Sequence, residues 1–296
     1  MASFGYLLFR SAFMLAEQIA PRATGRVAFE LFCRTPDPDR PTKREADMLR
    51  DSAAFMDEAR HHHLRTRDGW VVAHDFGPPE GRSAPAVLVV HGWRSRTEHM
   101  RTLIEALRHQ GFRVIALDLP GHGRSTGRRL NLALAVAAVR AAADWFGPFS
   151  AIVGHSFGGA VAVNAVFGSI RGIAPVEAKR LVLVAAPSSM PGLFEDFGRF
   201  LGLGTRTQMA LAGQVERVAG HPLESFVAAD QLRELRIETL AVHAPDDKEV
   251  SFESARQFED AGDHVRLVRV PGRGHRRIIA DAAIANQIAE FAVAGF

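Results

Sequence analysis

The feature that most constrains the fold of this chain is one serine, Ser156, within the run Gly-His-Ser-Phe-Gly-Gly at residues 154–159. The short apolar run at residues 149–153 is typical of a buried strand, whereas residues 160–170 place alanine and apolar residues at helical spacing. The serine therefore lies at a tight strand-to-helix turn, where glycines allow neighbouring chain to approach closely. The first N–H groups of such a helix, that of Phe157 in particular, are placed to bind negative charge. The sequence predicts a nucleophile elbow.

Strand and helix patterns alternate from residue 62 to the end of the sequence, which predicts an α/β fold with an open, mostly parallel sheet and helices on both faces. Asp68-Gly69 predicts a hairpin between the first two strands. The expected strands are residues 62–66, 70–76, 87–90, 114–117, 149–153, 181–184, 239–242 and 265–270. The expected helices are residues 98–109, 130–143, 160–170, 252–259 and 278–292. Ligands bind beyond the carboxyl ends of the strands in such sheets.

Two segments fall outside this alternation. Residues 187–235 contain too many apolar side chains for a plain loop, and we expect them to form a helical cap inserted in the core. Residues 1–58 are expected to form an N-terminal extension of one or two helices, broken at Pro21 and ending near Pro36 and Pro38. The α/β core then comprises residues 59–186 and 236–296.

A nucleophilic serine needs a base and a carboxylate that orients the base, each supplied by a loop at the carboxyl end of a strand. Asp246 and Asp247 follow the expected strand at residues 239–242, and His275 follows the strand at residues 265–270. The glycines around His275 predict that its imidazole lies in an irregular loop. The order Ser, Asp, His is therefore present, and either aspartate fits the role.

With these motifs the chain resembles the α/β-hydrolase superfamily, in its single-domain serine esterase and lysophospholipase-like branch, close to monoacylglycerol lipases. The resemblance covers residue 62 to the end of the chain. It also rests on His91-Gly92-Trp93 after the third expected strand and on the loop from Asp118 to Ser125 after the next. It implies that Ser156 attacks, that His275 shuttles the proton, and that the N–H groups of Trp93 and Phe157 bind the oxyanion.

The superfamily pattern Gly-x-x-Asp-x-x-Val-Pro also bears on the orienting acid. It aligns on Ala244, Asp247, Val250 and Ser251, which favours Asp247 over Asp246. Ala244 stands where glycine is usual and Ser251 where proline is usual, so the local turn departs from the pattern and Asp246 stays as the alternative.

The resemblance implies a serine carboxylic-ester hydrolase that works through an acyl-enzyme on lipophilic monoesters of modest acyl length, without a cofactor or a metal. A serine nucleophile argues against dehalogenase and epoxide-hydrolase chemistry, which use a carboxylate. Lactonase, thioesterase, acyltransferase and peptidase activities fit the same triad, and a catalytically silent binding protein with this fold is an alternative of another class. The expected pocket residues are His91, Gly92, His155, Met190, Phe194 and Phe197.

Charge and composition limit the kinds of binding partner and the compartment that we expect for this protein. The net charge is +3, but the basic residues are scattered, which does not favour nucleic-acid binding. The single cysteine, Cys33, excludes an internal disulfide, and residues 1–9 lack the basic region of a signal peptide, so we expect a cytoplasmic protein. Adjacent residues of a strand point to opposite faces, so His61-His62-His63 indicates an exposed strand start rather than a metal site.

The N-terminal helices carry arginines beside an apolar face formed by residues such as Phe4, Leu7, Leu15 and Ile19. Two interpretations stay open for this face. One is peripheral contact with a membrane. The other, which we favour, is packing on the cap or on a second subunit of a homodimer.

Overall fold

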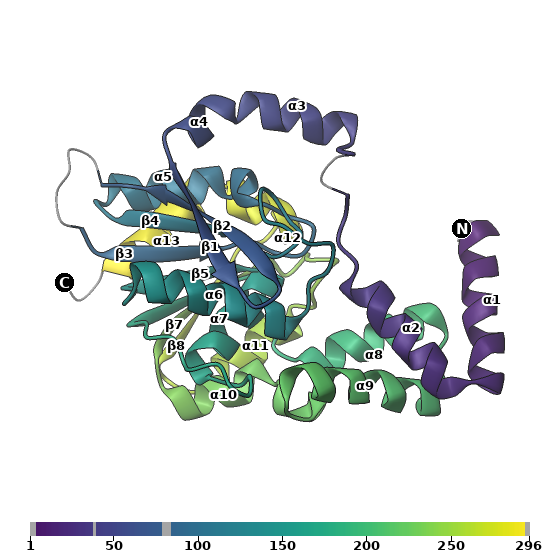
Figure 1. Ribbon diagram of the computed structural model, residues 1–296. Coiled ribbons are helices and arrows are strands. Elements are labelled where there is room, and N and C mark those ends of the chain that lie inside the picture. The colour runs from purple at the N-terminus through teal and green to yellow at the C-terminus, as the bar shows by residue number, and fades with distance from the viewer. Residues whose placement is uncertain (1–3, 38–39, 79–83, 294–296) are drawn as a thin grey trace.

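An eight-stranded sheet forms the centre of the molecule, in the order β1-β2-β4-β3-β5-β6-β7-β8 (Figure 1). The computed structural model describes residues 4–37, 40–78 and 84–293, with side chains from residue 7 onward. β1 pairs antiparallel with β2, and β2 with β4, while the other pairs are parallel. The predicted mostly parallel sheet is confirmed. The strands are β1 Arg60–Thr66, β2 Gly69–Phe76, β3 Ala86–Val90, β4 Arg113–Asp118, β5 Ala151–His155, β6 Arg180–Val184, β7 Glu238–His243 and β8 Val265–Arg269.

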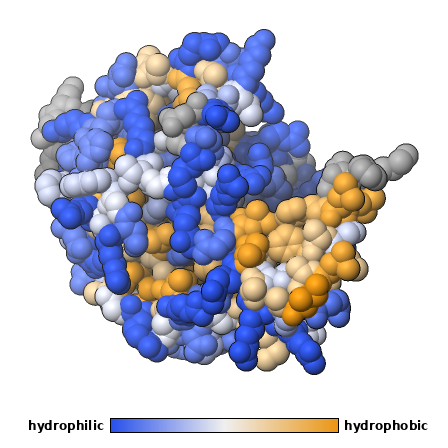
Figure 2. All heavy atoms as spheres, turned by 45° about the vertical axis from the view of Figure 1, so that its right-hand side comes forward, coloured by the Kyte–Doolittle hydropathy of each residue, from blue (hydrophilic) through white to orange (hydrophobic). Residues whose placement is uncertain are grey.

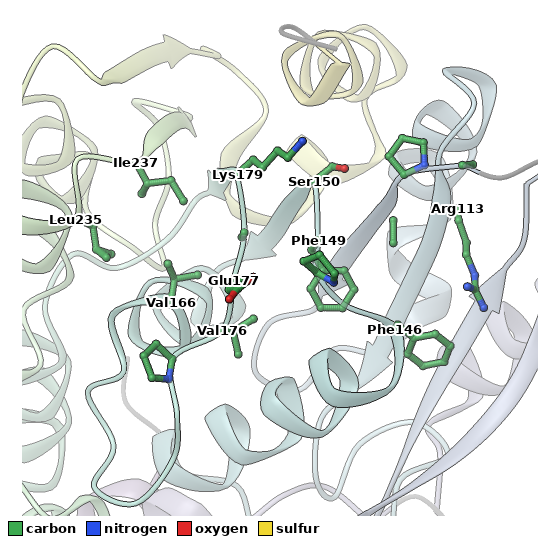
Figure 3. Close-up of a pocket in the computed structure, with 16 residues that line it drawn as sticks. Arg113, Phe146, Phe149, Ser150, Val166, Val176, Glu177, Lys179, Leu235 and Ile237 are labelled. Carbon is green, nitrogen blue, oxygen red and sulfur yellow. The ribbon is translucent and has the colours of Figure 1, made fainter.

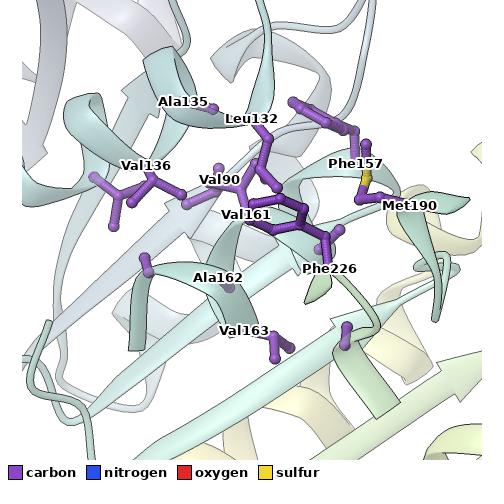
Figure 4. Packing of buried hydrophobic residues seen from close by; sticks show 14 of the residues in the cluster. Val90, Leu132, Ala135, Val136, Phe157, Val161, Ala162, Val163, Met190 and Phe226 are labelled. Carbon is purple, nitrogen blue, oxygen red and sulfur yellow. The ribbon is translucent and has the colours of Figure 1, made fainter. Parts of the chain in front are cut away.

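Helices cover both faces of this sheet, and alternate side chains of each strand serve the two faces. In β3, Leu88 and Val90 belong to the core under α6 (Leu132–Phe146) and α7 (Phe157–Phe167). Val87 and Val89 belong to the core on the other face, under α5 (Arg101–His109) and α13 (Ala282–Val293). Figure 4 shows how closely side chains of β3, α6 and α7 pack on the first face.

The short helical elements after the strands are η2 Thr97–Met100, α11 Glu253–Glu259, α12 Gly274–Arg277 and η4 Ile278–Ala280. Helix α7 begins at Phe157, directly after Ser156, in line with the expected position of the Phe157 N–H, and it ends at Phe167 rather than at residue 170. Gly158 lies so close to β3 that a Cβ on it would come within 2.3 Å of the Val90 carbonyl oxygen. One expectation needs correction here. His275 lies in the short helix α12 and not in an irregular loop.

Residues 187–235 and the N-terminal segment pack together into one layer beside the core. The first contributes α8 (Met190–Leu201), α9 (Thr205–Ala219), η3 (Leu223–Ser225) and α10 (Ala228–Leu235), and the second contributes α1 (Phe4–Ile19) and α2 (Pro21–Cys33). Helix α2 contacts α9, and α1 contacts both α2 and α8. At the α2–α9 crossing a Cβ on Gly25 would lie 2.7 Å from the Cβ of Ala210, so glycine permits the close approach. We refer to α1, α2, α8 and α9 as the outer layer.

The N-terminal segment contains four helices instead of one or two, since α3 (Lys43–Asp51) and α4 (Ala53–Asp57) follow α2. Helix α3 has no buried residue, so the apolar periodicity that marks a helix in sequence is missing. The signal that could have found it is a cap: the Thr42 hydroxyl accepts a hydrogen bond from the N–H of Glu45 at 3.3 Å, in the pattern Thr-x-x-Glu.

Candidate active site

Ser156 stands at the turn between β5 and α7 in a strained backbone conformation. Its φ is 55° and its ψ is −125°, a region that residues with a side chain rarely occupy. Its N–H donates to the carbonyl of Val184 on β6 at 2.8 Å, which fixes the turn against the sheet. A Cβ on Gly154 would lie 2.3 Å from the carbonyl oxygen of Gly158, so this glycine is needed for the chain to close on itself. The turn presents the Ser156 hydroxyl at the carboxyl end of β5.

Two side chains that follow β7 and β8 at the same edge of the sheet complete a hydrogen-bonded chain with this serine. Nε2 of His275 lies 3.0 Å from Oγ of Ser156, and Nδ1 of His275 lies 2.8 Å from Oδ2 of Asp247. The imidazole thus bridges a hydroxyl and a carboxylate, as a general base does in nucleophilic catalysis. The structure brings together Ser156, Asp247 and His275, three residues that the sequence singled out.

The neighbouring Asp246 has a different place. Its Oδ1 accepts a hydrogen bond from the N–H of Gly272 at 2.7 Å, so it ties the loop before His275 rather than the His275 ring. Oδ1 of Asp247 accepts from the N–H groups of Glu249 and Val250, at 2.8 and 3.0 Å. The turn that departs from the sequence pattern therefore still directs Asp247 toward the imidazole.

The electrostatics of Asp247 favour its charged form. Burial raises the pKa of this carboxyl, but hydrogen bonds from His243, His275 and the N–H groups of Val250 and Glu249 outweigh it and hold the pKa well below its usual range. Nε2 of His243 lies 3.3 Å from Asp247 and 3.1 Å from the carbonyl of Val250. His243, which the sequence did not assign to the site, is therefore a second imidazole on this carboxylate.

The loop after β3 lies against the elbow, and a histidine fixes its Gly92 carbonyl. The ring of His91 lies 2.7 Å from the Gly92 carbonyl through Nδ1, while its Nε2 accepts from the N–H of Leu119 at 3.0 Å. The C=O and N–H of one trans peptide unit point in opposite directions, so fixing the Gly92 carbonyl on His91 aims the Trp93 N–H away from it. A Cβ on Gly92 would lie 2.9 Å from the Cβ of Ser156, so the loop and the elbow are adjacent.

A second N–H comes from the elbow itself. Phe157 is the first residue of α7, and its N–H has no carbonyl partner within that helix. The rings of Trp93 and Phe157 meet edge to face with centroids 5.3 Å apart, which places the two loops side by side. The two residues that were predicted to donate these N–H groups are therefore in contact with each other, and Phe157 directly follows Ser156 in the chain.

A buried carboxylate supports the loop that carries Trp93. Asp118 accepts hydrogen bonds from the N–H and hydroxyl of Thr97, at 3.0 and 2.9 Å, and from the N–H of Arg124 at 2.8 Å. Nε2 of His74 lies 2.9 Å from the same carboxylate. The motif loop at residues 118–125 thus braces the 91–97 loop from behind.

Two of the predicted pocket residues, both histidines, are buried in the structure. His91 is buried, and burial lowers its pKa to about 3. His155 is also buried, its pKa is lowered to about 4 by burial, and its Nε2 lies 3.0 Å from the carbonyl of His275. A carbonyl only accepts, so Nε2 is the donor and His155 ties the His275 segment to β5. Both rings bond to backbone groups, but Nδ1 of His155 has no hydrogen-bond partner among the described residues, so a place for these rings in the pocket stays a prediction.

The aromatic residues predicted for the pocket lie in the outer layer, above the Trp93 and Phe157 rings. Their common neighbour is Phe32 of α2, which the sequence did not single out. Its ring centroid lies 4.4 Å from that of Phe194, 5.2 Å from Phe197 and 5.4 Å from Trp93. Phe29, Phe32, Met190 and Phe194 also line a gap of about 10 Å³ between α2 and the cap. We refer to the aromatic cluster of Phe32, Trp93, Phe157, Phe194 and Phe197 as the aromatic wall. The N-terminal extension contributes Phe32 to this wall, whereas the sequence analysis expected only residues 187–235 to cover the site.

A wider groove of about 990 Å³ lies away from this site, at the amino ends of the central strands (Figure 3). It is lined by Phe149, Ile237 and Arg113, among others, and by none of Ser156, Asp247 and His275. Since ligands of such sheets bind at the carboxyl ends of the strands, we place the site at Ser156 on chemistry rather than on cavity size.

The N-terminal histidine run has partners of its own. Nδ1 of His61 lies 2.9 Å from Nδ1 of His74, and Nε2 of His62 lies 3.7 Å from Asp75. Within residues 4–37, 40–78 and 84–293, no group of three or more His, Cys, Asp or Glu residues is arranged to hold a metal ion.

The chain has recognisable relatives among known proteins. Residues 87–287, more than half of the chain, match the sequence model described as the alpha/beta hydrolase family. The chain is 38% identical over 101 residues to the magnesium-chelatase 30 kDa subunit of Rhodobacter capsulatus, covering 33% of this chain and 34% of that protein. It is 36% identical over 104 residues to the bifunctional esterase/perhydrolase DCH of Acinetobacter calcoaceticus, covering 33% and 36%. The chain thus spans about a third of the length of each of these relatives.

Among solved structures, carboxylesterase CesB of Bacillus subtilis is similar, with a TM-score of 0.62 and 17% sequence identity. The superposition covers 86% of this chain and 98% of that one. At this identity the likeness indicates a shared fold.

Proposed function

The chain belongs to the α/β-hydrolase family, and from this premise we propose that it is a serine hydrolase that cleaves carboxylic esters through an acyl-enzyme. One observation carries the proposal. Oγ of Ser156, at a strained elbow, lies 3.0 Å from Nε2 of His275, whose Nδ1 lies 2.8 Å from Asp247. That chain of groups is what activation of a serine hydroxyl requires.

In the first half of the reaction, Oγ of Ser156 forms a bond to the ester carbonyl carbon while Nε2 of His275 takes the hydroxyl proton. The carbonyl oxygen becomes an oxyanion, which accepts hydrogen bonds from the N–H groups of Trp93 and Phe157, each typically worth about 3 kcal/mol. The tetrahedral intermediate then expels the alkoxide, which receives the proton from His275. The alcohol leaves, and the acyl group stays on Ser156.

In the second half, water attacks the acyl-enzyme, His275 takes the water proton and returns it to Oγ of Ser156, and the carboxylic acid is released. Asp247 stays ionised throughout because its pKa lies well below its usual range. Its negative charge stabilises the imidazolium that His275 forms in each half and holds the ring with Nε2 toward the serine.

The substrate class follows from the wall above the serine. A connected cluster of aromatic rings begins at the residue after Ser156, which suits a lipophilic acyl group. Its members are Phe157, Trp93, Phe32, Phe194 and Phe197. The gap between α2 and the cap holds only about 10 Å³, roughly the space of one water. An acyl chain of modest length therefore enters this wall by separating Phe32 from α8.

The test of the nucleophile is covalent labelling with a fluorophosphonate probe. We expect the wild type to be labelled and Ser156→Ala to be unlabelled, with kcat/KM for a p-nitrophenyl ester lower by about a thousandfold or more. Ser11→Ala, at an exposed position of α1, is the matched control and should keep both signals. An unlabelled but folded wild type would sink the proposal and favour a silent binding protein.

The acyl preference is tested with p-nitrophenyl esters of increasing acyl length. We expect the maximum of kcat/KM above acetyl, because an apolar wall gains more from a longer chain. A maximum at acetyl would contradict the lipophilic-substrate part of the proposal. Labelling without ester hydrolysis would instead point to lactone, thioester, peptide or acyl-transfer chemistry on the same triad.

A further inference from the structure

Helix α1 turns its two charged side chains, together with Phe13, toward the protein and most of its other apolar side chains away from it. Arg10 and Glu17, the two charged residues of α1, are both partly buried, and Phe13 between them is 8% exposed. The Glu17 carboxylate accepts a hydrogen bond from the N–H of Gly204, at the loop between α8 and α9. These contacts fix the inner face of α1 to the cap helices α8 and α9, which is the packing on the cap that the sequence analysis favours.

The opposite side of α1 is apolar and exposed. At 100° per residue, seven positions from successive turns fall within about two fifths of the helix circumference. We refer to them as the outer face of α1; they are Leu7, Leu8, Ser11, Ala12, Leu15, Gln18 and Ile19. None of these side chains carries a charge. A globular helix normally has the reverse polarity, with charges facing water.

The aliphatic side chains of this face are strongly exposed: Leu7 by 50%, Leu8 by 58%, Leu15 by 68% and Ile19 by 85%. Figure 1 places α1 at the side of the molecule away from the sheet, and Figure 2 shows hydrophobic residues gathered on the part that projects there. A contiguous apolar patch of this kind marks a binding surface rather than ordinary surface variation.

Two arginines close to the outer face of α1 indicate what kind of surface it binds. Arg22 and Arg26 lie on α2, directly after the end of α1, and both are exposed. Neither makes an ion pair with any part of the chain that the structure describes. The nearby Glu30 is already paired with Arg129 at 2.7 Å. The charge left to satisfy is therefore positive, which complements anionic lipid headgroups and offers nothing to a second copy of the same surface.

The length of α1 decides how it meets a bilayer. Its 16 residues make a helix of about 24 Å, shorter than the hydrocarbon core of about 30 Å. None of the helices in the described residues has the length and hydropathy to cross a bilayer. A short helix with one apolar face and flanking arginines is suited to lie in the plane of the interface.

We propose that the outer face of α1, with Arg22 and Arg26, docks the protein on an anionic membrane surface. The apolar side chains enter the boundary between headgroups and acyl chains, and the two arginines bind lipid phosphates. Helix α2 then lies next to the lipid surface, and the same helix carries Phe32 to the wall above Ser156. The membrane thus stands beside the helix that an incoming acyl group would meet.

The test is co-sedimentation of the full chain with vesicles of phosphatidylcholine containing a minority of phosphatidylglycerol. We expect the wild type to bind and Leu8→Glu/Leu15→Glu to lose binding by at least about tenfold, because two apolar side chains that enter the bilayer in the proposed complex become charged. Arg22→Gln/Arg26→Gln should weaken binding to these vesicles more than to pure phosphatidylcholine. Trp145→Glu is the matched control, since Trp145 is 66% exposed but lies on α6, and it should bind as the wild type does.

Vesicle binding is measured without substrate, so its outcome is independent of the proposed ester hydrolysis. Far-UV circular dichroism and the midpoint of urea unfolding serve as the fold check for each variant and should be unchanged. The proposal is overturned if the wild type does not bind, or if Leu8→Glu/Leu15→Glu binds equally well. It is also overturned if the wild type sediments as a dimer that this double variant dissociates without any vesicle binding, because the face would then be a self-interface.

Discussion

The α/β core and the outer layer hold their functional groups by different forces. In the core, Asp247, His275 and the loop before Trp93 are each fixed by hydrogen bonds to backbone groups, several of them buried. In the outer layer, Phe32, Phe194 and Phe197 meet through ring contacts at 4.4 to 5.2 Å. Hydrogen bonds specify direction, whereas apolar contacts specify mainly shape and area.

This difference divides the proposed function between the two regions. Catalysis requires that the groups that transfer a proton or bind the oxyanion are held in accurate positions and orientations, and the hydrogen bonds of the core hold them so. The choice of acyl group and of a place to work needs only apolar surface, and the outer layer supplies that. Substitutions in the core should therefore change turnover, while those in the outer layer should change preference.

The largest effect is expected at the core carboxylate. Asp247→Asn removes the charge that orients His275 and should lower kcat/KM by about a thousandfold or more, with the acyl-length preference unchanged. The measurement is steady-state hydrolysis of p-nitrophenyl esters of several acyl lengths. A variant that lost turnover and also changed its preference would break the division between core and outer layer.

Asp246→Asn is the matched control at the adjacent position. An asparagine keeps an oxygen that accepts from the N–H of Gly272, so this variant should stay within about threefold of the wild type. Full activity in Asp247→Asn together with its loss in Asp246→Asn would overturn the assignment of the acid.

A smaller effect is expected in the outer layer. Phe32→Ala enlarges the gap of about 10 Å³ beside Phe194, so the optimum should move to longer acyl chains, with kcat/KM for a long ester relative to a short one rising about tenfold. The same ester series measures this ratio. Phe200→Ala, at a half-exposed position of α8, is the control and should leave the ratio unchanged. A uniform loss across all acyl lengths would instead place Phe32 in support of the core.

The α/β core and the outer layer also differ in how much of their structure could be predicted from the sequence. Ser156, His275 and the strands around them could be predicted because an elbow needs glycines at set positions and because parallel strands deliver their loops to one edge. Asp247 needed the family pattern, since two adjacent aspartates follow the same strand and only the turn at residues 244–250 separates their directions.

The outer layer was less predictable because its contacts join segments far apart in the chain. Phe32 lies 61 positions before Trp93 and more than 160 before Phe194, and no local pattern links them. Likewise, the hydropathy of α1 indicated an apolar face but not which side of the helix packs on the protein. Packing of distant elements decided both, and it overrode what local propensity could indicate.

The smallest expected effect is on the pH dependence of the unfolding free energy, which reports whether His155 stays neutral in the core. Its pKa falls from 6.5 to about 4 because burial penalises the charged ring, so between these pH values the unfolded chain binds a proton that the folded chain does not. Stability therefore rises with pH across this window and is lost as the pH falls from about 6.5 toward 4. One such histidine contributes a slope of about 1.4 kcal/mol per pH unit.

His155→Gln removes this titration while its side-chain amide can still donate to the carbonyl of His275. We expect the slope of the unfolding free energy against pH to fall by about 1.4 kcal/mol per unit in urea titrations between pH 4 and 6.5. His221→Gln removes an exposed histidine beyond α9 and should change the slope far less. An unchanged slope in His155→Gln would mean that the ring accepts a proton in the folded core, and that the hydrogen bond to His275 does not depend on its neutral form.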